Sequence, residues 1–115
     1  MEKLVDILKA LSDETRLRIL NLLYEKELCV CDIMETLQIT QAKASRHLIY
    51  MKNAGLVQDR KQAQWAYYSI HKDERVRFID YLVYGTLREL ALYQHDLDRL
   101  NMWLTQKKDY CNKTK

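Results

Sequence analysis

The chain has 115 residues, of which 48% are hydrophobic and 30% are charged, and its formal net charge is only +3. That length suits a single domain with one core, and so many apolar residues exclude a disordered chain. Proline is absent and glycine occurs twice, which favours helices over a turn-rich barrel or sandwich.

The chain has no apolar run long enough to span a bilayer and does not begin with the layout of a secretion signal. We therefore expect a cytoplasmic protein with no membrane partner. The first predicted helix covers residues 2–11, because apolar residues at positions 4, 7, 8 and 11 form one helical stripe. Ser12 or Asp13 can cap a second helix, which is expected to bury Leu17, Ile19 or Leu20, and Leu23.

Two cysteines, Cys29 and Cys31, lie at the start of a short third helix that runs to about residue 37. Thiolates prefer soft, thiophilic ions. With three cysteines in a reducing compartment, a structural disulfide framework is not expected. In a regular helix these two side chains would point about 200° apart. They can bind one ion only if the first turn is distorted or the helix begins after Cys29.

A tight turn at residues 38–39 and a helix over residues 41–53 come next, so the third and fourth helices have the order of a helix-turn-helix. In that motif the second helix places N-terminal side chains on base edges, while Lys and Arg meet phosphates. Ala44, Leu48 and Met51 should face inward and Gly55 should end the helix. The candidate DNA contacts here are Thr40, Gln41, Lys43, Ser45, Arg46 and His47, of which His47 could equally be a packed core histidine.

Two segments rich in strand-forming residues, 56–60 and 65–70, predict a hairpin with residues 61–64 at its tip. This hairpin, over about residues 56–70, would be the wing of a winged helix-turn-helix. Its candidate DNA contacts are Arg60, Lys61, Gln62 and Gln64. Five Lys/Arg and one acid lie between residues 40 and 65. An ordinary solvated basic face has the same composition, so the charge supports DNA binding only together with the motif order.

The last predicted helix covers residues 73–107 and would be about 50 Å long. Apolar residues recur along it at close to 3.5-residue spacing. So small a domain does not need a helix of that length to cover itself, which favours a partner helix and a homodimer. The alternative is a helix folded back on its own core. Gly85 is a weak point in this helix.

Taken together, five segments resemble the ArsR/SmtB family of winged-helix metalloregulatory repressors over roughly residues 2–100. They are LSDETRLRIL at 11–20, ELCVCDI at 27–33, SRHL at 45–48, AGLV at 54–57 and DRKQ at 59–62. The resemblance implies a mainly helical winged helix-turn-helix with one β-hairpin, in the order four helices, two strands and a last helix. It also implies a single domain over residues 1–115, a homodimer built on the first and last helices, and a palindromic double-stranded operator released on metal binding.

Within the family, ELCVCDI and DRKQ are most similar to the arsenic-responsive repressors. This implies As(III) or Sb(III) as inducer, bound by Cys29 and Cys31, and no cofactor for DNA binding itself. The best-known arsenic pattern has a third cysteine where this chain has Met34, and a thioether is a poor substitute. Cys111 could complete a three-sulfur site, including one formed across the dimer. A small cellular thiol or water could do so instead, and Cys111 could equally have no role.

Other hypotheses remain open. Repressors that respond to Cd(II) or Pb(II) share ELCVC but use added cysteines in an N-terminal arm, and we expect no such arm here. Zinc sensors use carboxylate and histidine ligands along the last helix; His95, Asp96 and Asp98 lie there without a second histidine, so we expect a solvated face. The runner-up is a thiol-redox or persulfide sensor that pairs Cys29 or Cys31 with Cys111. An enzyme would need an anion-binding loop or a nucleophilic cysteine in a βα context, so we expect none.

Overall fold

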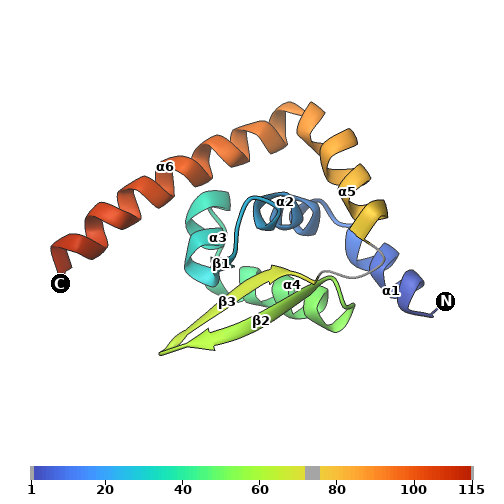
Figure 1. Ribbon diagram of the computed structural model, residues 1–115, viewed down its shortest axis with the longest axis horizontal. Coiled ribbons are helices and arrows are strands. Elements are labelled where there is room, and N and C mark those ends of the chain that lie inside the picture. Colours follow the sequence, from blue (N-terminus) through green and yellow to red (C-terminus); the bar gives the residue numbers. More distant parts are fainter. Residues whose placement is uncertain (1, 72–75, 115) are drawn as a thin grey trace.

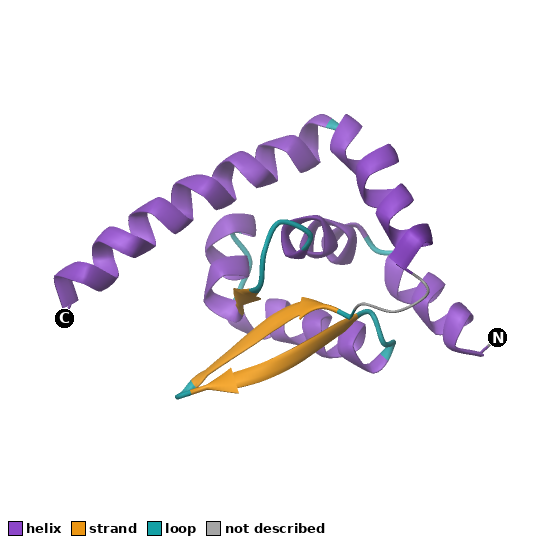
Figure 2. Ribbon diagram, in the orientation of Figure 1, coloured by secondary structure: helices purple, strands orange, loops and turns teal. Residues whose placement is uncertain are grey.

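The computed structural model of the chain describes the backbone of residues 2–71 and 76–114, and the side chains of residues 4–71 and 77–107 (Figure 1). Helices form most of the molecule and a β-hairpin projects from one side of them (Figure 2). The elements in chain order are α1 (Glu2–Leu11), α2 (Glu14–Leu23), β1 (Leu28–Cys29), α3 (Val30–Leu37), α4 (Gln41–Asn53), β2 (Val57–Gln62), β3 (Trp65–Ile70), α5 (Val76–Gly85), the 3₁₀ turn η1 (Leu87–Glu89) and α6 (Ala91–Thr114).

The helix boundaries near the centre of the chain follow from local capping. The Asp13 carboxylate accepts the Arg16 backbone N–H at 3.0 Å and begins α2, and the Thr40 hydroxyl accepts the Lys43 N–H at 3.1 Å and begins α4. After α4, Gly55 has φ of 85°, the left-handed conformation that glycine adopts without strain. The predicted helix over residues 41–53 and its cap are therefore confirmed.

One core cluster draws buried side chains from α1 to α6 and from the strands, and the inward faces of α2, α3 and α4 contribute to it. Ile33 and Leu37 from α3 and the predicted face of α4 are buried, as expected. On α2 the predicted inward face differs at two positions: Leu17 is only partly buried, and Leu22, which was not predicted to face inward, is fully buried. Packing α3 against α4 in this way sets the geometry of the helix-turn-helix.

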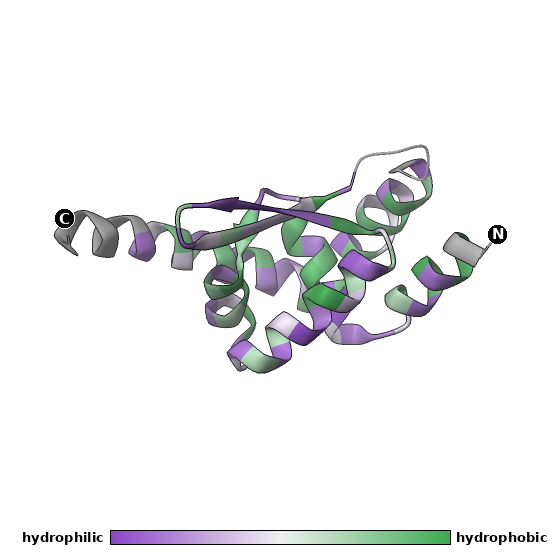
Figure 3. Ribbon diagram, turned by 90° about the horizontal axis from the view of Figure 1, so that it is seen from below, coloured by the Kyte–Doolittle hydropathy of each residue, from purple (hydrophilic) through white to green (hydrophobic). Residues whose placement is uncertain are grey.

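The small antiparallel sheet has the strand order β1-β3-β2. Its hairpin confirms the predicted wing, but β2 reaches Gln62, so the turn contains only Ala63 and Gln64. Most of β2 is hydrophilic (Figure 3). The strand β1 was not predicted: Leu28 pairs with Tyr68 and Cys29 with Tyr67. This pairing attaches the middle of β3 to the residue that precedes α3.

The single last helix predicted over residues 73–107 is wrong, and residues 73–75 lie outside the described residues. The chain bends between α5 and α6 (Figure 1). Glycine and threonine at 85 and 86 favour the helix weakly, and tertiary contacts hold the bend. Leu87 is buried in the core, and Arg88 donates to the Asn21 side chain at 2.5 Å.

Beyond the bend, α6 packs back along the domain. Arg18 of α2 donates two hydrogen bonds to Asp96, at 2.8 and 2.9 Å. Leu100 is buried, so the alternative of a helix covering its own core holds for this part. His95 and Asp98 are exposed as expected, but Asp96 is only 1% exposed and does not belong to a solvated face.

No helix in the described part of the chain combines the length and apolar character that crossing a bilayer requires.

Candidate functional site

The paired cysteines lie on either side of a helix start. Cys29 ends β1 with extended backbone (φ −92°, ψ 170°), and α3 begins at Val30. Cys31 is therefore the second residue of α3, and the pair does not share one regular helix. The helix thus begins after Cys29, which is one of the two conditions under which both sulfurs can bind one ion.

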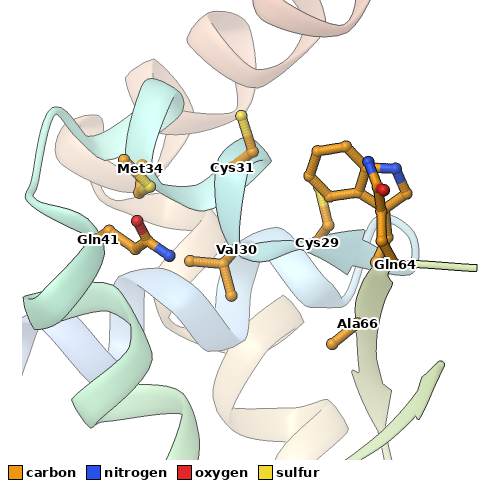
Figure 4. A pocket seen from close by; sticks show the side chains of 8 residues that line it. Cys29, Val30, Cys31, Met34, Gln41, Gln64 and Ala66 are labelled. Carbon is orange, nitrogen blue, oxygen red and sulfur yellow. The ribbon is translucent and has the colours of Figure 1, made fainter.

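Both cysteines line a cavity of about 400 Å³, here called the thiol cavity (Figure 4). Its walls come from three parts of the fold: β1 and α3, the first residue of α4, and the end of the hairpin. The lining residues are Cys29, Val30, Cys31, Met34, Gln41, Gln64, Trp65 and Ala66. The thiols thus share a cavity with Gln41 and Gln64, two of the residues expected at DNA.

The cysteine side chains are free thiols, Cys29 buried and Cys31 half-buried. Burial raises the pKa of each thiol, and for Cys31 the neighbouring Cys29 and Asp32 raise it further. Protonated thiols are the resting form that such a site favours, because a buried thiolate without a bound cation loses its solvation.

A buried carboxylate, Asp32, lies directly behind Cys29. Its Oδ2 accepts the Cys29 backbone N–H at 3.0 Å and lies 3.3 Å from the Cys29 sulfur. Its Oδ1 accepts Trp103 Nε1 at 2.9 Å and Lys107 Nζ at 2.8 Å. Burial raises the pKa of Asp32, but these hydrogen bonds outweigh that effect and leave the pKa below its usual value.

Asp32, Trp103 and Lys107 were not predicted as neighbours of the cysteines. Asp32 occupies the position at which an acidic side chain bonds back to a helix's first residues, which was a usable signal. Nothing local pairs it with residues more than 70 positions away in α6.

The third sulfur ligand is not visible among the described side chains. Within them, no three His, Cys, Asp or Glu residues form a group able to hold a metal ion. Met34 lines the thiol cavity with its thioether. Cys111 belongs to α6, one turn beyond Lys107, but its side chain lies outside the described residues. Lys107 Nζ is 3.7 Å from the Cys29 sulfur.

The predicted contacts of the recognition helix fall into two groups. Thr40, Gln41 and Arg46 are exposed, and Lys43 and Ser45 are half-buried. His47 is different: it is 8% exposed, and its Nδ1 lies 3.3 Å from Arg16 Nη1. Burial and nearby cations lower its pKa. The packing favours the core-histidine alternative for His47 over a contact with DNA.

In the wing, Lys61, Gln62 and Gln64 are exposed near the tip. Arg60 is engaged by the protein itself, since its guanidinium donates to both oxygens of Glu27 at 2.6–3.0 Å and to Gln62 at 2.8 Å. Because both Arg60 and Glu27 are accessible to solvent, this pair contributes little to stability. It holds the arginine against the segment that leads into β1.

The fold and the site together define a class: a winged helix-turn-helix regulator with a thiol pair where the motif begins. The family model for bacterial regulatory proteins of the arsR family matches residues 13–59. A cadmium resistance transcriptional regulatory protein CadC homolog of Staphylococcus aureus is 41% identical over 86 residues, which cover 74% of this chain and 70% of that protein. The chain belongs to the ArsR family of transcription regulators, whose members are not enzymes.

Two further relatives are arsenic regulators. An arsenic resistance transcriptional regulator of Pseudomonas putida is 39% identical over 82 residues, covering 70% of this chain and 63% of that protein. The arsenical resistance operon repressor of Escherichia coli is 48% identical over 67 residues, covering 57% of each. The chain thus spans less than two thirds of the length of either protein.

Solved structures confirm the architecture. HlyU from Vibrio cholerae superposes with a TM-score of 0.65 at 34% identity, covering 74% of this chain and 95% of that one. The homodimeric winged helix-turn-helix DNA-binding domain of a possible ArsR-family regulator from Mycobacterium bovis gives 0.68 at 27% identity, covering 76% and 82%. The predicted winged helix-turn-helix fold and the family resemblance are therefore confirmed, whereas the predicted order with one last helix is not.

Proposed function

We propose that this protein is a cytoplasmic, homodimeric repressor that leaves its operator when trivalent arsenic or antimony bonds to Cys29 and Cys31. The thiol cavity is the observation that carries this proposal. Its lining includes both cysteines together with Gln41, the first residue of the recognition helix, and Gln64 at the wing tip. A ligand in this cavity touches both halves of the DNA-binding unit.

The proposed DNA surface is the N-terminal end of α4 with the tip of the wing. Gln41, Lys43, Ser45 and Arg46 meet base edges and phosphates in the major groove, and the α4 N-terminus at Thr40 binds a phosphate. Lys61, Gln62 and Gln64 meet the flanking backbone or minor groove. Arg60 joins them if DNA displaces Glu27, its present partner.

The inducer chemistry follows from the two thiols. Arsenous acid exchanges a hydroxyl for each sulfur: an As–O bond breaks, an As–S bond forms, and the thiol proton leaves with the hydroxide as water. Two such exchanges release two waters and leave one hydroxyl on arsenic, which a third thiol such as Cys111 can replace. Soft thiolates favour such an ion.

Release follows because the two sulfurs must converge on one atom. Cys29 lies in β1 and Cys31 in α3, so convergence changes the chain at the start of α3. That helix packs directly on α4, and β1 pairs with β3 of the wing. A shift here changes the angle between recognition helix and wing, and the two no longer fit one DNA surface.

The proposed dimer uses apolar side chains that the single chain leaves exposed. On α1 these are Leu4, Val5 and Leu8, and on α5 they are Phe78, Tyr81 and Tyr84. Exposed apolar groups gathered on two helices are typical of an interface. Two-fold symmetry would then present two recognition helices to a palindromic operator.

The test is release from a duplex that the protein itself selects from random DNA. Arsenite should weaken binding at least tenfold, and Cys29→Ser and Cys31→Ser should each abolish that effect. Met34→Leu is the matched control and should respond as wild type, because the thioether is not a ligand. Release of the double variant Cys29→Ser, Cys31→Ser by arsenite would refute the proposal.

The same titration distinguishes the alternatives. Cadmium, lead and zinc arms test a divalent-ion inducer, which the similarity to the S. aureus CadC homolog makes a specific candidate. A peroxide arm tests a redox sensor, and a response to peroxide without one to arsenite would favour it. Cys111→Ser decides the third ligand: unchanged arsenite affinity removes Cys111 from the site.

A further inference from the structure

Asp32 joins the thiol site to α6, and none of the DNA-binding groups uses it. It is 2% exposed, and each of its oxygens faces a different element. Oδ2 is bonded to the backbone N–H and the thiol of Cys29, whereas Oδ1 accepts from Trp103 and Lys107. We name Asp32, Trp103 and Lys107 the Asp32 latch.

A ligand on Cys29 must disturb the Oδ2 side of this carboxylate. The Cys29 sulfur, 3.3 Å from Oδ2, can donate its proton to the carboxylate. When arsenic replaces that proton, the donor disappears and an electron-rich sulfur faces a carboxylate in a buried site. A buried carboxylate that loses a donor is destabilised. Asp32 is also the residue next to Cys31, so it moves whenever Cys31 does.

The two groups that donate to Asp32 Oδ1, on Trp103 and Lys107, have room to move when the carboxylate moves. Lys107 Nζ lies 2.8 Å from Asp32 and 3.7 Å from the Cys29 sulfur, so a small movement transfers it from the carboxylate to the sulfur. Trp103 borders a cavity of about 220 Å³ between α3 and α6, which gives its indole room to move when the carboxylate does. Two contacts of α6 thus depend on what Cys29 binds.

We propose that the Asp32 latch transmits the state of the thiol site to α6, as a second route beside the direct contact of α3 with α4. Trp103 and Lys107 are coupling residues: they act through Asp32 and not on the inducer itself. α6 continues through the bend at η1 into α5, which carries part of the proposed dimer surface. Loosening the latch therefore changes how the two recognition helices are spaced. This inference rests on the proposed function.

The test separates coupling from binding and from folding. Three quantities are measured for each variant: the arsenite Kd, the operator Kd without arsenite, and the ratio of operator Kd values with and without arsenite. Trp103→Phe removes the N–H donor and keeps an aromatic ring. We expect its arsenite Kd and its arsenite-free operator Kd to stay within threefold of wild type, while the ratio falls from at least tenfold to below threefold. Met102→Leu, next to it on α6, is the control and should keep the wild-type ratio.

A second measurement does not depend on a latch variant folding. The chain has two tryptophans, so Trp65→Phe leaves Trp103 as the only one. Arsenite should change its emission, and Cys29→Ser should remove that change. A full release ratio in Trp103→Phe, or constant Trp103 emission while arsenite releases the operator, overturns the latch and leaves the proposed function intact. Arsenite that binds without releasing wild type overturns both.

Discussion

Replacing Asp96 by alanine should be among the most damaging single changes in the described part of α6. The Asp96 side chain is 1% exposed and accepts two hydrogen bonds from Arg18, whose side chain is 19% exposed. Alanine leaves that guanidinium mostly buried without its carboxylate, and it separates α2 from α6 at their closest polar contact.

The magnitude follows from the geometry. Removing one partner of a buried, hydrogen-bonded ion pair costs about 3–5 kcal/mol. Because Arg18 is about one-fifth exposed, water recovers part of its solvation, and we expect a loss at the lower end, about 3 kcal/mol. For a domain of this length that corresponds to a fall in Tm on the order of 10 °C.

Urea unfolding followed by circular dichroism measures this loss, at one fixed protein concentration because a dimer's stability depends on concentration. Asp98→Ala is the matched control, since Asp98 is exposed on the same helix, and it should change the free energy of unfolding by less than about 0.5 kcal/mol. The double variant Arg18→Met, Asp96→Leu should recover much of the loss, because apolar side chains then replace both charges. A loss for Asp96→Ala no larger than that for Asp98→Ala would refute the reasoning.

Three further predictions address the wing, the buried histidine and the DNA surface. Ala63 has φ of 57° in the hairpin turn, so Ala63→Gly should raise the free energy of unfolding by up to about 1 kcal/mol in urea titrations; a loss of stability would contradict this. The pKa of His47 is lowered in the folded chain by burial, so the unfolded chain binds its proton first. The neutral His47 side chain contributes its full stabilisation above the unfolded-state pKa of about 6.5, and this stabilisation is lost as pH falls through and below that value. The free energy of unfolding of His47→Gln should therefore decrease less than that of wild type between pH 7 and pH 5. Lys61→Met should weaken binding equally on specific and random duplexes and reduce the slope of log K against log salt by about 1, whereas an effect confined to one sequence would assign Lys61 to a base.

The arsenic hypothesis depends most on coordination. The proposed site draws two sulfurs from the thiol pair, and Cys111, one turn beyond Lys107, is the candidate for the third; the Met34 thioether in the same cavity is a poor ligand. Arsenite affinity in Cys111→Ser and operator release in the Asp32 latch variants therefore test different steps: the first concerns what holds the ion, and the second concerns where the signal goes.

Local sequence was sufficient for the helices around the DNA-binding motif. Apolar spacing predicted the inward face of α4, and Thr40 and Gly55 marked its ends, because capping and left-handed geometry are properties of a few adjacent residues. The order of the motifs led to the family for the same reason: each motif is short and contiguous. The start of α3 after Cys29 was one of two alternatives that helix geometry itself allowed.

Tertiary structure decided the parts that depend on distant partners. Spacing shows that a helix has an apolar face but does not say what covers that face. One helix was therefore predicted over residues 73–107, where the burial of Leu87 and the hydrogen bond from Arg88 to Asn21 hold a bend. Asp96 was expected in solvent because its burial depends on Arg18, 78 positions away. Asp32 likewise meets Trp103 71 positions later. The sequence by itself determined which residues form the helix-turn-helix and that two cysteines stand where its first helix begins. Only the folded chain shows what each buried charge is paired with, because such pairs form between residues that are far apart in the chain.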